Sequence, residues 1–287
     1  MILGPKDKLE LFKKLFPTEE IKSVSENQGA EHYILDINDL WICKISKNIE
    51  SSGLEIEANL LKSLHSKLKT KIPIVEYYES GFLIYKKIPG VELTNEIYEG
   101  LSKKQKDKLA YDIAFFLYEL HNSLSIDDAK TIGLTKNNWP WPSEKLIQQA
   151  FLIEDAELKK IFQTFIKTYS YLRKEDKVTL VHNDMILRNI IIDARAGLLS
   201  GVIDFTDAAL DALYIDLRLN YMSIPDLNES IAKNYATIAN VALNIKKIYI
   251  YYMATEFSRY LEHIKEQKID ELNKIKDRII SNLKYLR

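Results

Sequence analysis

The residues whose types and spacing suit chemistry gather late in the chain, between Val178 and Asp216. Asp184 and Asn189 stand five residues apart between two short apolar runs, and Asp204 ends a third run. Apolar runs of this length that are bounded by turn residues predict short strands. The pattern therefore places Asp184 and Asn189 on a loop between two strands, and Asp204 at the end of a third strand folded back beside them.

This set of side chains suits phosphoryl transfer. That reaction needs a carboxylate to orient the attacking hydroxyl, and oxygen ligands to hold Mg²⁺ on the phosphates. We expect Asp184 to accept the hydroxyl proton, and Asn189 and Asp204 to bind Mg²⁺. The alternative is that these are ordinary turn residues, since Asp and Asn favour turns. That alternative does not explain why a third acidic residue, Asp204, stands at the end of the next predicted strand.

The strings HNDMILRN and IDFTDAALDALYID, which carry these residues, resemble the catalytic and metal loops of the protein-kinase-like fold. The resemblance is to the aminoglycoside phosphotransferase family, nearest to its 2''-phosphotransferases, where H-G/N-D-x-x-x-x-N/H is followed by I-D-F-G-D-A. This chain has Thr206 where the family usually has Gly, and Ala212-Leu213 where it usually has Asp-Pro. These departures leave open the shape of the loop after Asp204, but they remove no metal ligand.

The resemblance implies an α+β, bilobal protein-kinase-like fold. A small antiparallel-sheet lobe, residues 1–87, would cover the nucleotide, and a larger, mainly helical lobe, residues 88–287, would carry the catalytic residues and bind the acceptor. Local patterns agree with the smaller lobe. They predict a helix over residues 7–16, strands near 21–25, 32–37 and 40–45, a helix after Gly53, and a hairpin across Ser80-Gly81.

Lys44 is the residue of interest in the predicted third strand. Strand alternation places Lys44 and Ile42 on one face and Cys43 on the other. By resemblance, Lys44 binds the α- and β-phosphates, Ile42 lines the base pocket, and Glu57 pairs with Lys44. On spacing alone Glu55 competes with Glu57, and the alanine directly after Glu57 matches the family pattern. The plain alternative for Lys44 is a solvent-facing lysine on an edge strand.

Two further segments are expected to contact the nucleotide. The first hairpin, with Ser25 and Gly29, corresponds to the loop that covers the phosphates, although Gly29 is its only glycine. The segment from Tyr85 through Lys86 to Ile88 resembles the hinge whose backbone recognises the purine. The side chains do not decide between ATP and GTP as the donor.

The C-terminal part is expected to be helical, with helices at about 229–243, capped by Asn228, at 245–266, and from 269 onward. The string YYMATEFSRYLEH resembles the helix that carries an acidic acceptor contact in the 2''-phosphotransferases, which would map to Glu256. A solvated helix-face glutamate is an equal alternative. Arg188 is a candidate for contact with the transferred phosphoryl group or the acceptor. We interpret His121 as a structural histidine that braces the catalytic loop.

Composition restricts the class of partner. Lys and Arg total 40 against 41 Asp and Glu, so net charge gives no support to nucleic-acid or membrane binding. Cys43 is the single cysteine and is expected to be a small buried hydrophobe. The N-terminus lacks a signal-peptide core, and no stretch approaches about 18 consecutive apolar residues. We therefore expect a cytoplasmic, monomeric protein.

Three functions compete at this point. The first is an aminoglycoside kinase that uses Mg²⁺ with ATP or GTP and confers antibiotic resistance. Six aspartates between residues 184 and 216 suit a cationic small-molecule acceptor. The second is a kinase for another small alcohol, such as choline or a sugar. The third is a non-catalytic nucleotide-binding protein that retains the kinase fold.

Overall fold

A five-stranded antiparallel sheet is the scaffold of the first of two units into which the chain divides. The computed structural model describes residues 4–29, 31–48, 53–218 and 224–283. The first unit comprises Met1–Asp112, Asp127–Leu134 and Ile186–Ala208, and the second comprises Ile113–Ile126, Thr135–Met185 and Ala209–Arg287. The sequence-based boundary between residues 87 and 88 falls inside the first unit, and the division into functional lobes stays a prediction.

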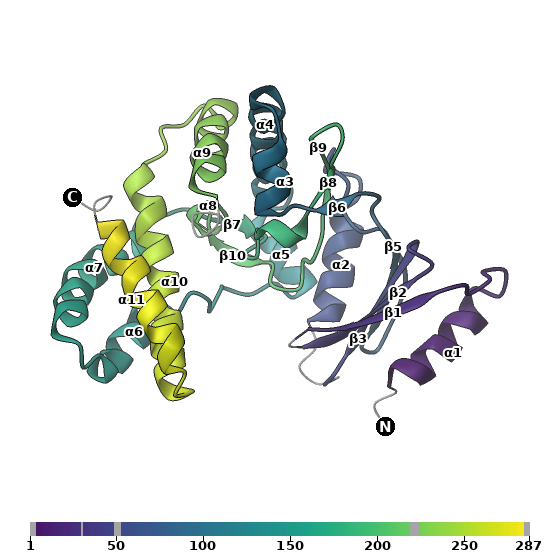
Figure 1. Ribbon diagram of the computed structural model, residues 1–287, viewed down its shortest axis with the longest axis horizontal. Coiled ribbons are helices and arrows are strands. Elements are labelled where there is room, and N and C mark those ends of the chain that lie inside the picture. The colour runs from purple at the N-terminus through teal and green to yellow at the C-terminus, as the bar shows by residue number, and fades with distance from the viewer. Residues whose placement is uncertain (1–3, 30, 49–52, 219–223, 284–287) are drawn as a thin grey trace. The chain divides into compact units, whose positions relative to one another are not determined.

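The sheet has the strand order β1-β2-β3-β5-β4. Its strands are β1 (Val24–Gln28), β2 (His32–Ile37), β3 (Trp41–Ser46), β4 (Val75–Glu79) and β5 (Phe82–Lys86). Helices α1 (Pro5–Leu15) and α2 (Leu54–Leu64) cover its two faces (Figure 1). Strand alternation explains the arrangement, because Cys43 packs in one core with Phe12 of α1, whereas Ile42 packs in another with Leu54 of α2. Each large apolar side chain buried in this way contributes about 1.5–3 kcal/mol.

A three-stranded sheet, ordered β6-β8-β9, completes the strands of the first unit. It is formed by β6 (Val91–Glu92), β8 (Ile190–Asp193) and β9 (Leu198–Val202). Gly90 precedes β6 with φ 139°, and a Cβ added there would lie 2.6 Å from the Ile192 carbonyl oxygen. Only glycine fits this approach. Helices α3 (Asn95–Gly100), the first part of α4 (Lys103–His121) and most of α5 (Ile126–Ile132) also belong to this unit.

The second unit is mainly helical around a two-stranded ribbon in which β7 (Val178–Val181) pairs with β10 (Ala209–Ala212). Its helical elements are the second part of α4, from Ile113, and α6 (Ser143–Gln149), η2 (Ala150–Leu152), α7 (Ala156–Glu175), α8 (Tyr214–Leu217), α9 (Pro225–Ala239), α10 (Ile245–Lys265) and α11 (Ile269–Asn282). Helix α10 is the core element of this unit, since it contacts α6, α7, α8 and α11. Within the described residues, every helix is too short or too polar to cross a membrane.

The predicted α+β class is confirmed, and most element positions agree with the sequence patterns. Several details were wrong. Strand β1 spans Val24–Gln28, three residues later than expected. Helix α9 spans Pro225–Ala239 rather than about 229–243, and Asn228 lies inside it, where its amide donates to the carbonyl oxygen of Leu217. Strand β10 was missed, because its sequence ALDA lacks the β-branched and aromatic residues that mark strands.

Candidate active site

Lys44 and Glu57 form a buried ion pair in the first unit. Lys44 lies on β3, the middle strand of its sheet, and Glu57 lies on the first turn of α2. The Lys44 Nζ atom is 2.8 Å from Glu57 Oε1 and 3.0 Å from Glu57 Oε2. The two side chains are 5% and 0% exposed. An exposed lysine on an edge strand is therefore excluded, and Glu55, which is exposed, is not the partner.

Asp204 joins this ion pair from the turn after β9. Its Oδ1 atom lies 2.8 Å from Lys44 Nζ, and its side chain is 38% exposed. Burial alone would lower the pKa of Lys44, but the negative charges of Glu57 and Asp204 outweigh burial and raise the pKa above its ordinary value. The lysine is therefore a fixed cation that two carboxylates hold in place.

Asn189 is brought to the same part of the first unit. Its carbonyl oxygen accepts the backbone N–H of Ile203 at 3.0 Å, so its backbone is bonded to the residue before Asp204. Asn189 is buried at the end of a 3₁₀ turn, Leu187–Asn189. One carboxylate and one amide oxygen suit Mg²⁺, which takes few protein ligands and completes its shell with phosphate and water. Among the described residues, no cluster of three or more His, Cys, Asp or Glu suggests another metal site.

Thr206 is part of this network, and its role was missed. Its Oγ1 atom lies 2.8 Å from Glu57 Oε2 and 3.2 Å from Lys44 Nζ. The sequence signal was the replacement of the usual glycine at this position, which indicated an altered loop but not a hydrogen bond.

Ile42 and Tyr85, the predicted base-pocket residues, are cross-strand partners in β3 and β5. Tyr85 is 4% exposed, and burial raises the pKa of its hydroxyl above the ordinary value. Both side chains belong to the core beneath α2, on the face of the sheet that also bears Lys44. The predicted phosphate-loop residues lie elsewhere on the sheet: Ser25 is exposed on the edge strand β1, and Gly29 is in the turn that follows it. Ala30 of that turn lies outside the described residues.

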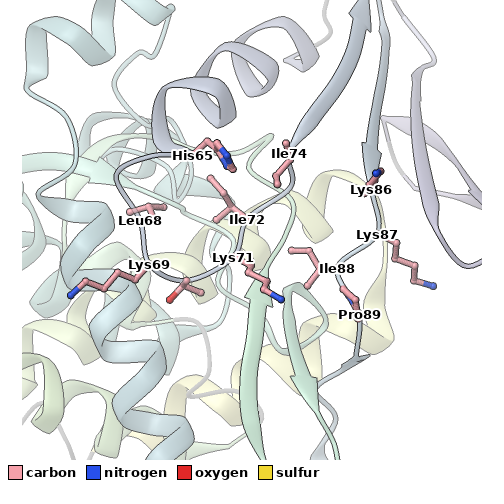
Figure 2. Close-up of a pocket in the computed structure, with 11 residues that line it drawn as sticks. His65, Leu68, Lys69, Lys71, Ile72, Ile74, Lys86, Lys87, Ile88 and Pro89 are labelled. Carbon is pink, nitrogen blue, oxygen red and sulfur yellow. The ribbon is translucent and has the colours of Figure 1, made fainter. Parts of the chain in front are cut away.

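Lys86 and Ile88 border a cavity of about 370 Å³ that lies within the first unit. Figure 2 shows Ile88 and Pro89 on one side of it, with Ile72 and Ile74 on the other. The residues that line this cavity include lysines, a histidine and apolar side chains, and no carboxylate. It therefore lacks the groups that phosphoryl transfer requires, and it is not the metal and phosphate site. Lys86 Nζ lies 5.4 Å from the centre of the Trp41 ring.

Asp184 lies in the second unit, on a loop that is held by Asp216. The buried carboxylate of Asp216 accepts the backbone N–H of His182 at 2.9 Å and that of Asn183 at 2.7 Å. Burial alone would raise the pKa of Asp216, but the hydrogen bonds that it accepts from His121 and from the backbone N–H of His182 lower it below the ordinary value. Asp184 follows this anchor and is half-buried. Asp216 therefore fixes the backbone that presents Asp184.

Buried partners complete the support of this loop. His121 bonds to Asp216 through Nε2 at 2.9 Å and to the Tyr235 hydroxyl through Nδ1 at 2.8 Å, which confirms that it braces the loop. The fully buried Arg218 donates to Asn183 Oδ1 at 3.2 Å. Burial lowers the pKa of Arg218 to about 10. The role of Arg218 could not be predicted from the sequence, because only the structure shows that it bonds to this loop.

Two candidate acceptor contacts differ in environment. Arg188 is exposed, in the first unit. Glu256 is fully buried in α10 and belongs to the second unit. Its Oε2 atom accepts from Arg278 Nε at 2.9 Å, and its Oε1 atom lies 3.5 Å from Arg259 Nη1. The solvated-face alternative for Glu256 is therefore excluded, while its contact with an acceptor stays a prediction.

The aspartates between residues 184 and 216 are largely occupied by structural contacts. Four of them make the following contacts: Asp193 accepts two backbone N–H groups of its turn, Asp204 pairs with Lys44, Asp211 with Arg173 and Asp216 with His121. Their number is thus explained by the structure, and it does not by itself indicate a cationic acceptor.

Comparisons with known proteins give the family of the chain and show similar folds. A model of the phosphotransferase enzyme family matches residues 20–237. The fold is similar to that of aminoglycoside 2'-phosphotransferase-IIIa in complex with GDP, with a TM-score of 0.81, 20% identity and coverage of 98% of each chain. It is also similar to the ternary complex of streptomycin, ATP and APH(2")-IIa, with a TM-score of 0.69, 22% identity and coverage of 96% of this chain and 97% of that one. Macrolide 2'-phosphotransferase type I has a TM-score of 0.69 at 17% identity, with coverage of 97% and 98%.

Proposed function

The chain belongs to the phosphotransferase enzyme family, and from this premise we propose that it transfers the γ-phosphoryl group of ATP or GTP to a hydroxyl of an aminoglycoside. The observation that carries this proposal is the buried network of Lys44, Glu57 and Asp204. Lys44 and Glu57 are buried, and each loses its hydration, so burying this pair costs free energy. Binding of the nucleotide phosphates by Lys44 gives a reason for the chain to keep the pair.

The first unit supplies the donor side of the proposed reaction. Lys44 binds the phosphates of the nucleotide, and Glu57 holds its ammonium in place. Asn189 and Asp204 hold Mg²⁺, which neutralises the charge of the phosphate oxygens when it is bound. Ile42, Tyr85 and the segment from Lys86 to Ile88 are proposed to contact the base.

The second unit supplies the base. Asp184 accepts a hydrogen bond from the acceptor hydroxyl and then its proton, as a bond forms between the acceptor oxygen and the γ-phosphorus. The bond from the γ-phosphorus to the bridging oxygen of the β-phosphate breaks, and the nucleoside diphosphate leaves. The support for this role is the position of Asp184 immediately after a loop that Asp216 anchors.

The acceptor class rests on the solved structures of similar fold. Among these, APH(2")-IIIa was solved with GDP and kanamycin, and APH(2")-IIa was solved with gentamicin. A macrolide is the second candidate, because the fold matches macrolide 2'-phosphotransferase type I and the streptomycin complex with the same TM-score of 0.69. Fold alone does not choose between the two acceptors.

The test is phosphate transfer from ATP and, separately, from GTP to kanamycin, gentamicin, streptomycin, a macrolide, choline and common sugars. We expect transfer to at least one aminoglycoside, and a loss of about 100-fold to 10,000-fold in Asp184→Asn, the usual contribution of a general base. Asp107→Asn, which changes an exposed aspartate of α4, is the matched control and should retain the wild-type rate.

Other outcomes point elsewhere. Transfer only to the macrolide, to choline or to a sugar would contradict the aminoglycoside and leave the chemistry in place. Nucleotide binding without transfer to any acceptor would support the non-catalytic alternative.

A further inference from the structure

The Thr206 hydroxyl lies among three charged groups of the first unit. Its Oγ1 atom is 2.8 Å from Glu57 Oε2, 3.0 Å from Asp204 Oδ1 and 3.2 Å from Lys44 Nζ. We propose that Thr206 is a positioning residue that holds Glu57 and Asp204 in the arrangement that binds Mg²⁺ and nucleotide. This inference rests on the proposed function and deepens it.

The chemistry of a hydroxyl suits this place. Glu57 and Asp204 share the single cation of Lys44, so two negative charges face one positive charge. A threonine hydroxyl has one proton to donate and lone pairs that accept. It donates to one carboxylate at a time and accepts from the Lys44 ammonium, which reduces the repulsion between the two carboxylates without adding charge. A methyl group of the same size offers neither interaction.

Other atoms of the segment 204–206 also contact the N-terminal end of α2. The backbone N–H of Phe205 donates to Glu57 Oε1 at 3.3 Å. A Cβ added to Gly53, the residue before α2, would lie 3.4 Å from the Thr206 Cγ2 methyl. The methyl and the hydroxyl of Thr206 therefore face the start and the first turn of one helix. A glycine at position 206 would have neither group.

The backbone conformation of Asp204 requires stabilising contacts from its surroundings. Asp204 has φ 67°, in the left-handed region that residues with a Cβ rarely adopt. Such a conformation persists where surrounding contacts hold it. The bond between Thr206 Oγ1 and Asp204 Oδ1 is one of these contacts, and it fixes a carboxylate that is proposed to ligate Mg²⁺.

The test measures binding rather than turnover. A fluorescent ATP or GTP analogue is titrated at a series of Mg²⁺ concentrations with wild type, Thr206→Val and Thr206→Ser. We expect Thr206→Val to weaken the apparent Mg²⁺ affinity by about 10-fold to 100-fold, the usual effect of removing a hydrogen-bond partner of a metal ligand. Thr206→Ser keeps the hydroxyl and should therefore bind Mg²⁺ more tightly than Thr206→Val and close to wild type. Thr131→Val, which removes an exposed hydroxyl bonded to the Asp127 carbonyl in α5, should match wild type.

Each outcome is decisive. Equal Mg²⁺-dependent binding by wild type and folded Thr206→Val would overturn the inference and leave the proposed function intact. A lower melting temperature of Thr206→Val with unchanged Mg²⁺ affinity would also overturn it, because the role would then be structural only. If Thr206→Val does not fold, Thr206→Ala takes its place, with the same ranking below Thr206→Ser expected. Failure of the wild type to bind any Mg²⁺–nucleotide would contradict the proposed function and the inference with it.

Discussion

His121 Nε2 lies 2.9 Å from Asp216 Oδ2, and both side chains are buried. The same carboxylate accepts the backbone N–H groups of His182 and Asn183. One aspartate therefore links helix α4 to the loop that carries Asp184. Because a carboxylate is charged and accepts through both oxygens, an amide of the same shape cannot reproduce this arrangement.

We expect Asp216→Asn to lower the free energy of unfolding by about 1–3 kcal/mol, the usual cost of leaving a buried hydrogen-bonding group without its partner. The new amide would also direct N–H donors at a backbone N–H group. Urea denaturation near neutral pH measures the change, and Asp107→Asn, on the exposed face of α4, serves as the control. A change below about 0.5 kcal/mol, the range of ordinary surface substitutions, would contradict the anchoring role.

Acid should remove the contribution of Asp216 to the free energy of unfolding. The pKa of Asp216 in the folded chain is lowered from its ordinary value of 3.8, since the hydrogen bonds that it accepts from His121 and from the backbone N–H of His182 outweigh the effect of burial. A lowered carboxyl pKa stabilises the folded state above the unfolded pKa, and this contribution is lost as pH falls through the folded pKa. Wild type should therefore lose stability more steeply than Asp216→Asn as pH falls below about 4. Parallel pH dependences in urea denaturation would contradict this assignment.

Cys43 should resist thiol reagents in the folded chain. It is 1% exposed, and burial raises the pKa of its thiol to about 12. Since the thiolate is the reactive form, about a thousandfold less of it is present near neutral pH than for an ordinary cysteine. Reaction with a chromogenic disulfide should be slow for native protein and immediate in denaturant. Rapid labelling of the native chain would show that β3 opens readily.

The sequence predicted the fold where a pattern was long or a turn was marked. Strand alternation across β3 separated the Lys44 face from the Cys43 face, and both assignments hold in the packed sheet. The start of α9 was misplaced, because Asn228 has the residue type of a cap while its amide bonds to the Leu217 carbonyl oxygen. Residue type and local sequence pattern do not show which side chains will form tertiary hydrogen bonds.

The candidate site likewise contains residues that motifs predicted and residues whose roles depend on tertiary contacts. Lys44, Glu57 and Asp204 were predicted from the resemblance of their segments to family motifs, and the structure brings all three together. Thr206 and Arg218 were not assigned roles, because their importance comes from partners distant in the chain. Thr206 is 149 residues from Glu57, and Arg218 is 35 from Asn183. Spacing along the sequence carries no information about such pairs.

Glu256 provides a further test, because family resemblance and burial assign it different roles. Its carboxylate is 0% exposed and lies against Arg278 and Arg259, whose side chains are each 29% exposed. We expect Glu256→Gln to lower the free energy of unfolding by about 1–3 kcal/mol, less than for a fully buried pair because solvent screens both arginines. Glu262→Gln on the same helix is the control and should remain within about 0.5 kcal/mol of wild type. Urea denaturation and the KM for the acceptor, measured on the same variants, separate the two roles. Reduced stability with an unchanged KM would support the ion-pair role, whereas a raised KM with unchanged stability would support the acceptor contact.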